Sequence, residues 1–457
     1  MSVQRAVVIG SGPNGLAAAI QLAGAGLEVE VREAADEPGG AVRSAQLTLP
    51  GFVHDICAGI LPLAAGSPAF RDVEVDWIHP EAPLAHPLDG GDAVVLERSL
   101  EETAASLGAD AAAYRRTLGP YVAAWSDIAA LRPLGSVRRL GAAPICAGLA
   151  QAAAFAERRF TGPRARALFA GNAAHSMLPL ERRPSAGFAL ALLTMGHTVD
   201  WPFPRGGAAR LTAALISRLE TLGGTVVTGA PVDELPQADL VLADIAPREL
   251  LRIAASHLPE RYHRALARYR HGPGSFKVDW ALSAPIPWAS PAAARAGTLH
   301  LGGTLDEVAA SERAPWDGRV AERPLVILAQ PGRFDPTRGQ TAWAYCHVPN
   351  GSEEDLTERI ERQVERFAPG FREVVLARHV YGPAELERHN RNLVGGDIND
   401  GAMDLGQLLF RPVRRVVPYR TPLRNLYICS AATPPGGGVH GLCGYLAARL
   451  ALRDLRR

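Results

Sequence analysis

The chain of 457 residues has little lysine and cysteine and no long apolar run. Lys277 is the single lysine among 48 lysine and arginine residues, so the other 47 are arginine. No run of about 18 apolar residues occurs, which argues against a transmembrane helix. The nearest candidate is the alanine-rich segment Ala142–Phe155. We expect it to form a buried helix, and it leaves open a peripheral membrane contact.

Disulfides and a structural metal are also not expected. The five cysteines are odd in number and widely scattered, and neither a CxxC nor an HExxH spacing occurs. They are Cys57, Cys146, Cys346, Cys429 and Cys443. The N-terminus enters an apolar strand almost at once, without the charged and apolar regions of a secretory leader. These features predict a cytoplasmic protein.

Charge and length limit the class of protein further. The formal net charge is +1, and no block of like charges interrupts the sequence. The sequence therefore predicts no nucleic-acid partner. At roughly 150 residues per domain, the length predicts two or three domains.

The first forty residues predict a βαβ unit. An apolar strand, Ala6–Ile9, runs directly into "GSGPNG", and a small-residue helix is expected from Leu16. The loop has the GxGxxG spacing through Gly10, Gly12 and Gly15. Glycines at these positions allow backbone amides to reach a pyrophosphate at the positive end of the helix.

A second strand ends at Glu33, eighteen residues after Gly15. Its carboxylate is placed to accept hydrogen bonds from a ribose, which disfavours a 2′-phosphate. A few residues later comes "GGAVRS", with Gly39, Gly40 and Arg43. This segment resembles the GGxxRS motif of the superfamily of FAD-containing amine oxidases and phytoene dehydrogenases. The resemblance implies FAD as cofactor, with Arg43 suited to phosphate oxygens.

The resemblance extends over essentially the whole chain. "PRGGAARLTAAL" is similar to the family's return to the FAD domain. "GGTVVTGAPVDEL" is similar to the hairpin that follows, which implies that the backbone of Val232 lies at the adenine. The C-terminal "SAATPPGGGVHG" implies that amides around Gly438, Val439 and His440 face the flavin. Many relatives have Gly-Asp or Gly-Ala where Ser430-Ala431 stands here.

Several longer segments, among them "GSFKVDWAL" and "GGDINDGAMDLGQLLFRP", resemble the bacterial phytoene-dehydrogenase-like group. That group is itself similar to pyridine nucleotide-disulfide oxidoreductase domain-containing protein 2. The implied fold class is α/β: a Rossmann-like FAD-binding domain of the glutathione-reductase and amine-oxidase type, with a discontinuous α+β substrate domain. The expected FAD domain comprises 1–70, 204–250 and 415–457, and the substrate domain 71–203 and 251–414.

Within the substrate domain, the pattern predicts a mainly helical region and an antiparallel sheet. The region 70–201 is alanine-rich and helical in character. Strands between 275 and 378 are longer and richer in aromatic residues, as in antiparallel sheets. In "FKVDWAL" the period-two alternation places Phe276, Val278, Trp280 and Leu282 on one face of a strand. Lys277 and Asp279 then share the other face.

Lys277 is a candidate catalytic residue. Flavin amine oxidases have a lysine on a similar strand that holds a water near flavin N5, and the resemblance implies that role here. An amine can lose its proton when it is desolvated, whereas a guanidinium effectively cannot. The alternative is that Lys277 only pairs with Asp279 at a sheet edge or is a compositional remnant.

Other candidates are weaker. His440 is a candidate acid or base, with a backbone contribution as the favoured alternative. Asp55, which follows His54, is expected to make structural hydrogen bonds. Trp343 and Tyr345 share one strand face, and we favour the core over a pocket wall for both.

The predicted activity is hydride transfer from a small hydrophobic organic substrate to flavin N5, as in a dehydrogenase or desaturase. Three alternatives stay open: an amine oxidase acting on C–N bonds, a flavin-dependent saturase or isomerase, and a flavin-bound interaction protein without turnover. The sequence does not determine the oligomeric state.

Overall fold

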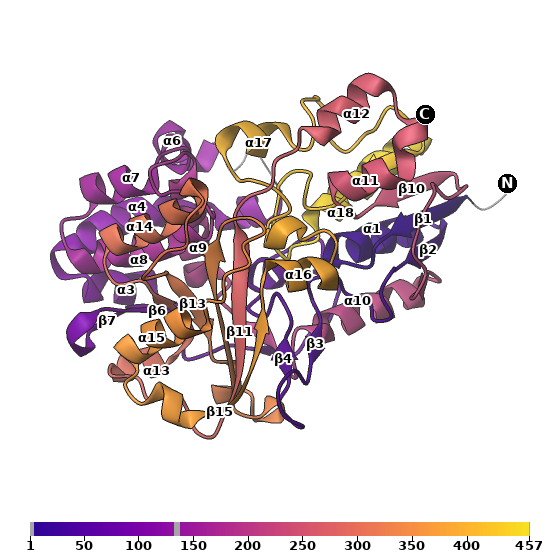
Figure 1. Ribbon diagram of the computed structural model, residues 1–457. Coiled ribbons are helices and arrows are strands. Elements are labelled where there is room, and N and C mark those ends of the chain that lie inside the picture. Colours follow the sequence, from indigo (N-terminus) through magenta and orange to yellow (C-terminus); the bar gives the residue numbers. More distant parts are fainter. Residues whose placement is uncertain (1–3, 132–137, 457) are drawn as a thin grey trace.

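A five-stranded parallel sheet joins segments from the beginning, middle and end of the chain (Figure 1). The computed structural model describes residues 4–131 and 138–456. The spatial order of strands is β16 (Leu426–Ile428), β10 (Leu240–Ala243), β1 (Arg5–Ile9), β2 (Glu28–Arg32) and β9 (Thr225–Val227). Ala6, Val7 and Val8 are fully buried, because helices cover both faces of the sheet. The predicted βαβ unit is present.

The helices of this layer are α1 (Pro13–Gly24), α10 (Ala209–Thr221) and α18 (Leu442–Leu455). α1 packs between the other two. It begins three residues before the predicted Leu16, since Pro13 is compatible with the first turn of a helix. The expected hairpin after α10 is wrong: β9 is a single strand that pairs in parallel with β2.

The second large sheet of the protein has seven strands. Its strands, in spatial order, are β15 (Val375–Tyr381), β11 (Gly274–Leu282), β14 (Thr341–Val348), β13 (Val326–Ala329), β12 (Ala296–Leu301), β6 (Ala82–Pro87) and β7 (Ala93–Leu96). Every neighbouring pair is antiparallel except β12 with β6. The sheet is thus mixed. Its one parallel pair joins β12 to β6, two strands that are far apart in the sequence.

The two faces of this sheet have different partners. Phe276, Val278 and Trp280 of β11 lie in one apolar core with α15 (Thr357–Phe367). The other face meets helices α4 (Ala111–Ala129), α8 (Pro163–Ala174) and α9 (Ser185–Thr198). These helices lie together on the left of Figure 1. The alternation predicted for β11 is therefore the alternation observed.

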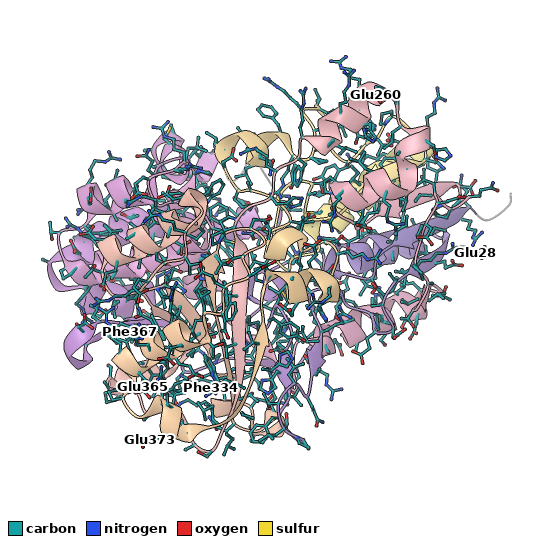
Figure 2. All side chains as sticks on the ribbon, viewed as in Figure 1. Glu28, Glu260, Phe334, Glu365, Phe367 and Glu373 are labelled. Atoms are coloured by element: carbon teal, nitrogen blue, oxygen red, sulfur yellow. The ribbon has the colours of Figure 1, made fainter. Side chains whose placement is uncertain are left out.

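Figure 2 shows how side chains fill the space between these layers. Phe367 at the end of α15 is buried, whereas Glu28, Glu260 and Glu373 are exposed at the periphery of the molecule. Phe367 thus belongs to an apolar core, and these three glutamates lie on the outer surface.

Two expectations for the middle of the chain have different outcomes. The region 70–201 is mainly helical, as expected, but it also contains the strands β6 and β7, joined by a turn in which Gly90 has φ +81°. The segment Ala142–Phe155 is not one buried helix. α6 (Ala142–Gly148) has no buried residue, and a separate helix, α7 (Ala152–Arg159), follows it. Among the described residues, no helix is long and apolar enough to cross a membrane.

Candidate functional site

A cavity of about 660 Å³ lies where the two sheets meet. Its wall includes Gly10 and Glu33, which follow strands β1 and β2 of the parallel sheet, and Lys277 and Tyr345 from the mixed sheet. Sheets that end at a common crevice are a usual place for ligand sites, because loops at the strand ends surround the space. The cavity therefore brings the predicted nucleotide residues and the predicted lysine into one site.

The glycine loop forms one end of this cavity. Gly10 follows β1 with φ +94°, a conformation that side chains other than glycine rarely adopt. Gly15 donates its amide hydrogen to Asp244 Oδ2 at 2.8 Å. A Cβ atom on Gly15 would lie only 2.0 Å from the carbonyl oxygen of Gly10. The close contact between loop and helix therefore requires glycine at this position.

The second glycine pair is attached to the first loop through Ser11. The amide of Gly39 donates to Ser11 Oγ at 3.0 Å, and Ser11 Oγ donates to Glu33 Oε2 at 2.6 Å. A Cβ atom on Gly40 would lie 3.0 Å from Gly12 Cα. The two motifs thus touch each other through backbone atoms. Gly12 and Gly40 line the cavity, whereas Gly15 and Gly39 support it from behind.

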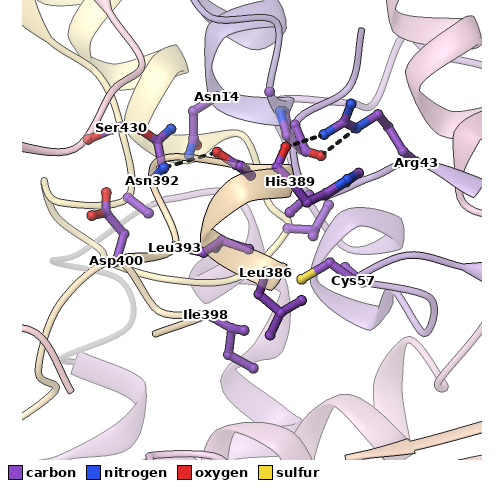
Figure 3. Close-up of a pocket in the computed structure, with 18 of the residues that line it drawn as sticks. Asn14, Arg43, Cys57, Leu386, His389, Asn392, Leu393, Ile398, Asp400 and Ser430 are labelled. Carbon is purple, nitrogen blue, oxygen red and sulfur yellow. Dashed lines mark hydrogen bonds between the residues drawn. The ribbon is translucent and has the colours of Figure 1, made fainter. Parts of the chain in front are cut away.

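Glu33, Arg43 and Val232 also line the cavity. Glu33 Oε1 accepts a hydrogen bond from the Ala35 amide at 2.9 Å, so the carboxylate is held by the loop after β2. Arg43 donates to the carbonyl oxygens of Gly40 and His389 at 3.1 and 2.7 Å, as Figure 3 shows. These contacts orient the guanidinium along the cavity wall.

The C-terminal loop before α18 contributes Gly438 and Val439 to the wall. His440 is absent from the lining residues and is 4% exposed. Its Nδ1 accepts the Leu442 amide at 3.0 Å, and its Nε2 lies 3.2 Å from the Gly436 carbonyl oxygen. Burial lowers the pKa of His440 to about 4. The structure therefore uses this neutral ring to hold its own loop, rather than directing it into the cavity.

Lys277 lies on the cavity side of β11 and is 3% exposed. Its Nζ donates to Asp279 Oδ2 and lies 5.5 Å from the centre of the Trp343 ring. The pairing with Asp279 is present, but β11 lies between β15 and β14, not at a sheet edge. Burial raises the pKa of Asp279 to about 6.

A second buried group stands behind this pair. His54 Nδ1 lies 3.6 Å from Asp279 Oδ1, and neither atom has a hydrogen-bond partner among the residues described. His54 Nε2 is 2.7 Å from the hydroxyl of Thr48, which is partly exposed. Burial lowers the pKa of His54 to about 3. Lys277, Asp279, His54 and Thr48 thus form a row of polar groups from the cavity to the partly exposed Thr48.

Asp55 has the structural role expected for it. It accepts hydrogen bonds from Arg338 at 2.8 Å and from the Ala208 amide at 2.7 Å. Trp343 and Tyr345 both line the cavity, with ring centres 6.2 Å apart. The core assignment for these two rings is therefore wrong, since the sheet face that carries them borders the cavity.

Sequence reasoning missed two acidic residues in the wall, Asp244 and Asp400. Burial raises the pKa of Asp244 to about 8 and that of Asp400 to about 7. Asp244 follows β10 directly, and an aspartate at the end of a buried parallel strand was an available signal. Asp400 lines the cavity together with Ser430 (Figure 3), although it comes from a distant loop and no local sequence pattern predicts this position.

Comparisons with known proteins agree with this geometry. Residues 8–73 match the family model described as NAD(P)-binding Rossmann-like domain. The rat and mouse proteins named pyridine nucleotide-disulfide oxidoreductase domain-containing protein 2 are 26% and 28% identical. The rat alignment covers 99% of this chain and 94% of that protein, and the mouse alignment 66% and 60%. A phytoene dehydrogenase from Streptomyces griseus is 25% identical over 87% of this chain and 81% of its own.

Solved structures show the same fold. An oxidoreductase from Methanosarcina mazei superposes with a TM-score of 0.66 at 17% identity, covering 98% of this chain and all of that one. Putrescine oxidase superposes with a TM-score of 0.62 at 17% identity, with both chains fully covered. The predicted fold class and resemblance are confirmed: the protein has a Rossmann-like nucleotide-binding domain within the amine oxidase fold, and its relatives are oxidoreductases.

Proposed function

We propose that the protein is an FAD-dependent oxidoreductase that moves a hydride between a hydrophobic organic substrate and flavin N5. One observation carries the proposal: a single cavity is lined by the glycine loop, by Glu33 and by the buried Lys277. The first two fit the nucleotide part of the cofactor, and the third lies on the sheet that faces it. The resemblance to phytoene dehydrogenases and amine oxidases supports this assignment.

The residues present fit FAD. The first turn of α1 presents backbone amides, and buried Asn14 Oδ1 on this turn has no partner among the described residues. Glu33 would hold the adenosine ribose, and Arg43 would lie along the diphosphate. The carbonyl oxygen of Val232 accepts a hydrogen bond from Arg252 at 2.8 Å. The backbone group of Val232 that would contact the adenine is therefore its amide. When bound, the flavin supplies the hydride acceptor.

The C-terminal loop would support the other end of the cofactor. Backbone amides at Gly438 and Val439 stand just before α18, whose N-terminal end carries positive partial charge. Developing negative charge on the reduced ring would be stabilised there. Because the His440 side chain is engaged within the loop, the proposal for this segment concerns its main chain.

Lys277 would handle the proton that accompanies the hydride. The Lys277 amine can accept a proton from a substrate or a water in the cavity only after its own proton has passed to Asp279. For a second proton to follow, Asp279 must first release the one it holds, and His54 lies next in the direction of the surface. Lys277 is 3% exposed and Asp279 is fully buried, so the pair is largely shielded from bulk solvent.

The cofactor assignment is tested by titrating nucleotide-free protein with FAD. We expect one FAD per chain, a visible flavin spectrum, and much weaker binding of FMN and NAD. Glu33→Gln should weaken FAD binding about tenfold or more, because a hydrogen bond to a charged group contributes about 1.5–3 kcal/mol. Glu37→Gln, an exposed position in the same loop, is the matched control. A folded protein that binds no FAD would refute the proposal.

The role of Lys277 is tested by comparing Lys277→Arg with Lys277→Met. Both variants should slow reduction of the flavin by an active compound from a panel of amines, isoprenoids and lipids by about 100-fold or more, the usual scale for loss of acid–base catalysis. Lys277→Met should also destabilise the fold by about 3–5 kcal/mol, because it leaves Asp279 buried without its partner. Lys277→Arg retains a positive charge beside Asp279, so it should lower the rate without the loss of stability expected for Lys277→Met.

The double variant Lys277→Met/Asp279→Asn should recover most of the stability but not the rate. Rates equal to the wild type in both single variants would leave Lys277 with only the ion-pair role. Reduction of the flavin by a panel of amines, but by no isoprenoid or lipid, would favour the amine-oxidase alternative.

A further inference from the structure

The cavity extends along the mixed sheet well beyond Lys277. Lys277 on β11 stands opposite Tyr345 on β14, Tyr345 opposite Ile327 on β13, and Ile327 opposite His300 on β12. Adjacent strands are about 4.8 Å apart, so three steps place His300 about 14 Å from the amine. The sheet thus provides a long floor for a ligand.

Between these ends the wall is largely apolar and aromatic. Ile327, Tyr345 and Trp343 line it from the sheet. Leu192 lines it from the middle of α9, and Trp201 from the segment after this helix. Such a surface contacts an apolar body and offers it little hydrogen bonding.

The far end is polar again. Thr298 of β12 lines the cavity, is 2% exposed, and its hydroxyl has no hydrogen-bond partner within the described part of the chain. His175, at the end of α8, also lines the cavity, and its Nε2 lies 2.9 Å from Nε2 of the fully buried His300. The edge of the Trp201 ring packs against His175, with centres 5.7 Å apart.

A buried hydroxyl without a hydrogen-bond partner destabilises the protein, because the group has lost its bonds to water. The position of Thr298 in the cavity wall makes a ligand the natural partner. His175 adds a second polar group whose orientation is fixed by His300. Together they form a preorganised hydrogen-bonding end, at the opposite end of the floor from Lys277.

The far end carries no net charge. Burial lowers the pKa of His175 to about 3 and that of His86, beyond His300, to about 4. The buried Glu312 is paired with His347 at 2.7 Å, and neither of these two lines the cavity. A charged ligand group would lose its hydration there without gaining an opposite charge.

We propose that Thr298 and His175 form a subsite for an uncharged hydrogen-bonding group, such as a hydroxyl or carbonyl, at the remote end of an elongated apolar substrate. The substrate body lies along Ile327 and Tyr345, and its reacting end lies at Lys277. The position of the reacting end rests on the proposed function, whereas the subsite does not require the flavin.

The probes are 1-decanol, sodium decanoate and decylamine, titrated into the FAD-supplemented protein at pH 7. Binding is followed by the fluorescence of the tryptophans, two of which line the cavity, and by the flavin absorbance. We expect 1-decanol to bind at least about tenfold more tightly than either charged probe. Equal or tighter binding of decanoate or decylamine would overturn the proposal.

Thr298→Val removes the hydroxyl and keeps the shape of the side chain. It should weaken 1-decanol binding about fivefold, the value of one hydrogen bond, and raise the thermal midpoint of the free protein. The matched control is Thr117→Val, another buried threonine, whose hydroxyl bonds within α4. His175→Leu is the second variant and should weaken decanol binding by a similar factor.

The outcomes separate this subsite from the proposed function. Decanol binding that depends on Thr298 in a protein that binds no FAD would support the subsite and refute the flavin assignment. A flavin-loaded, photoreducible protein in which both variants bind decanol like the wild type would overturn the subsite and leave the flavin assignment standing.

Discussion

Replacing Gly15 by alanine is expected to destabilise the protein by at least about 3 kcal/mol and to abolish FAD binding. The new Cβ would lie 2.0 Å from the Gly10 carbonyl oxygen, a backbone atom that cannot move without displacing β1. Overpacking in a tight core costs about 1–3 kcal/mol even where side chains can adjust, and here they cannot. The shift would also separate the Gly15 amide from Asp244.

Urea unfolding and the ratio of flavin to protein absorbance measure the two effects. Gly119→Ala is the matched control, because Gly119 lies inside α4 with no atom within 4 Å of a new Cβ. This control should be neutral or stabilising by about 0.5–1 kcal/mol, since alanine favours the helix. Wild-type stability and flavin content in Gly15→Ala would contradict the packing described for this loop.

Replacing Asp244 by asparagine is expected to change how stability depends on pH. Burial raises the pKa of Asp244 to about 8 in the folded protein, whereas the ordinary value is 3.8. Between these values the folded state holds a proton that the unfolded state has lost. The free energy of unfolding therefore falls as the pH rises from about 4 to 8.

The variant lacks this titration but retains an oxygen that can accept from the Gly15 amide. At about 1.4 kcal/mol per pKa unit, its advantage over the wild type should grow by on the order of 4 kcal/mol between pH 5 and pH 8.5. The measurement is urea unfolding of nucleotide-free protein at both pH values. Asp400→Asn should act in the same direction, because burial raises the pKa of Asp400 to about 7. Parallel stability curves for wild type and Asp244→Asn would show that Asp244 is already ionised in the fold.

Secondary structure could be predicted from the sequence where a single short segment contains the complete pattern. The strand, glycine loop and helix around Gly10 predicted the βαβ unit, and the alternation in β11 predicted the face of Lys277. The strands β6 and β7 were missed although the turn "DGG" stands between them, because the alanine-rich surroundings favour helix. The exposed α6 shows the reverse case, in which alanine-rich composition did not ensure burial.

Contacts between distant segments needed the structure. Ser430-Ala431 stands where the resemblance implies Gly-Asp or Gly-Ala, and Asp400 reaches the same cavity from another loop. His440 shares its loop with Gly438, yet its ring turns away from the cavity to bond to Gly436 and Leu442. Thr298 and His175 are 123 residues apart, as their numbers give, and nothing in either segment indicates a common site.

The sequence by itself determined the class of protein, because the spacing of glycines and the period of apolar residues are local consequences of helix and strand geometry. Only the tertiary structure decided which polar groups share the cavity. That choice depends on the register of seven strands and on the helices that pack against the sheet face bordering the cavity, and these are set by packing across the whole chain.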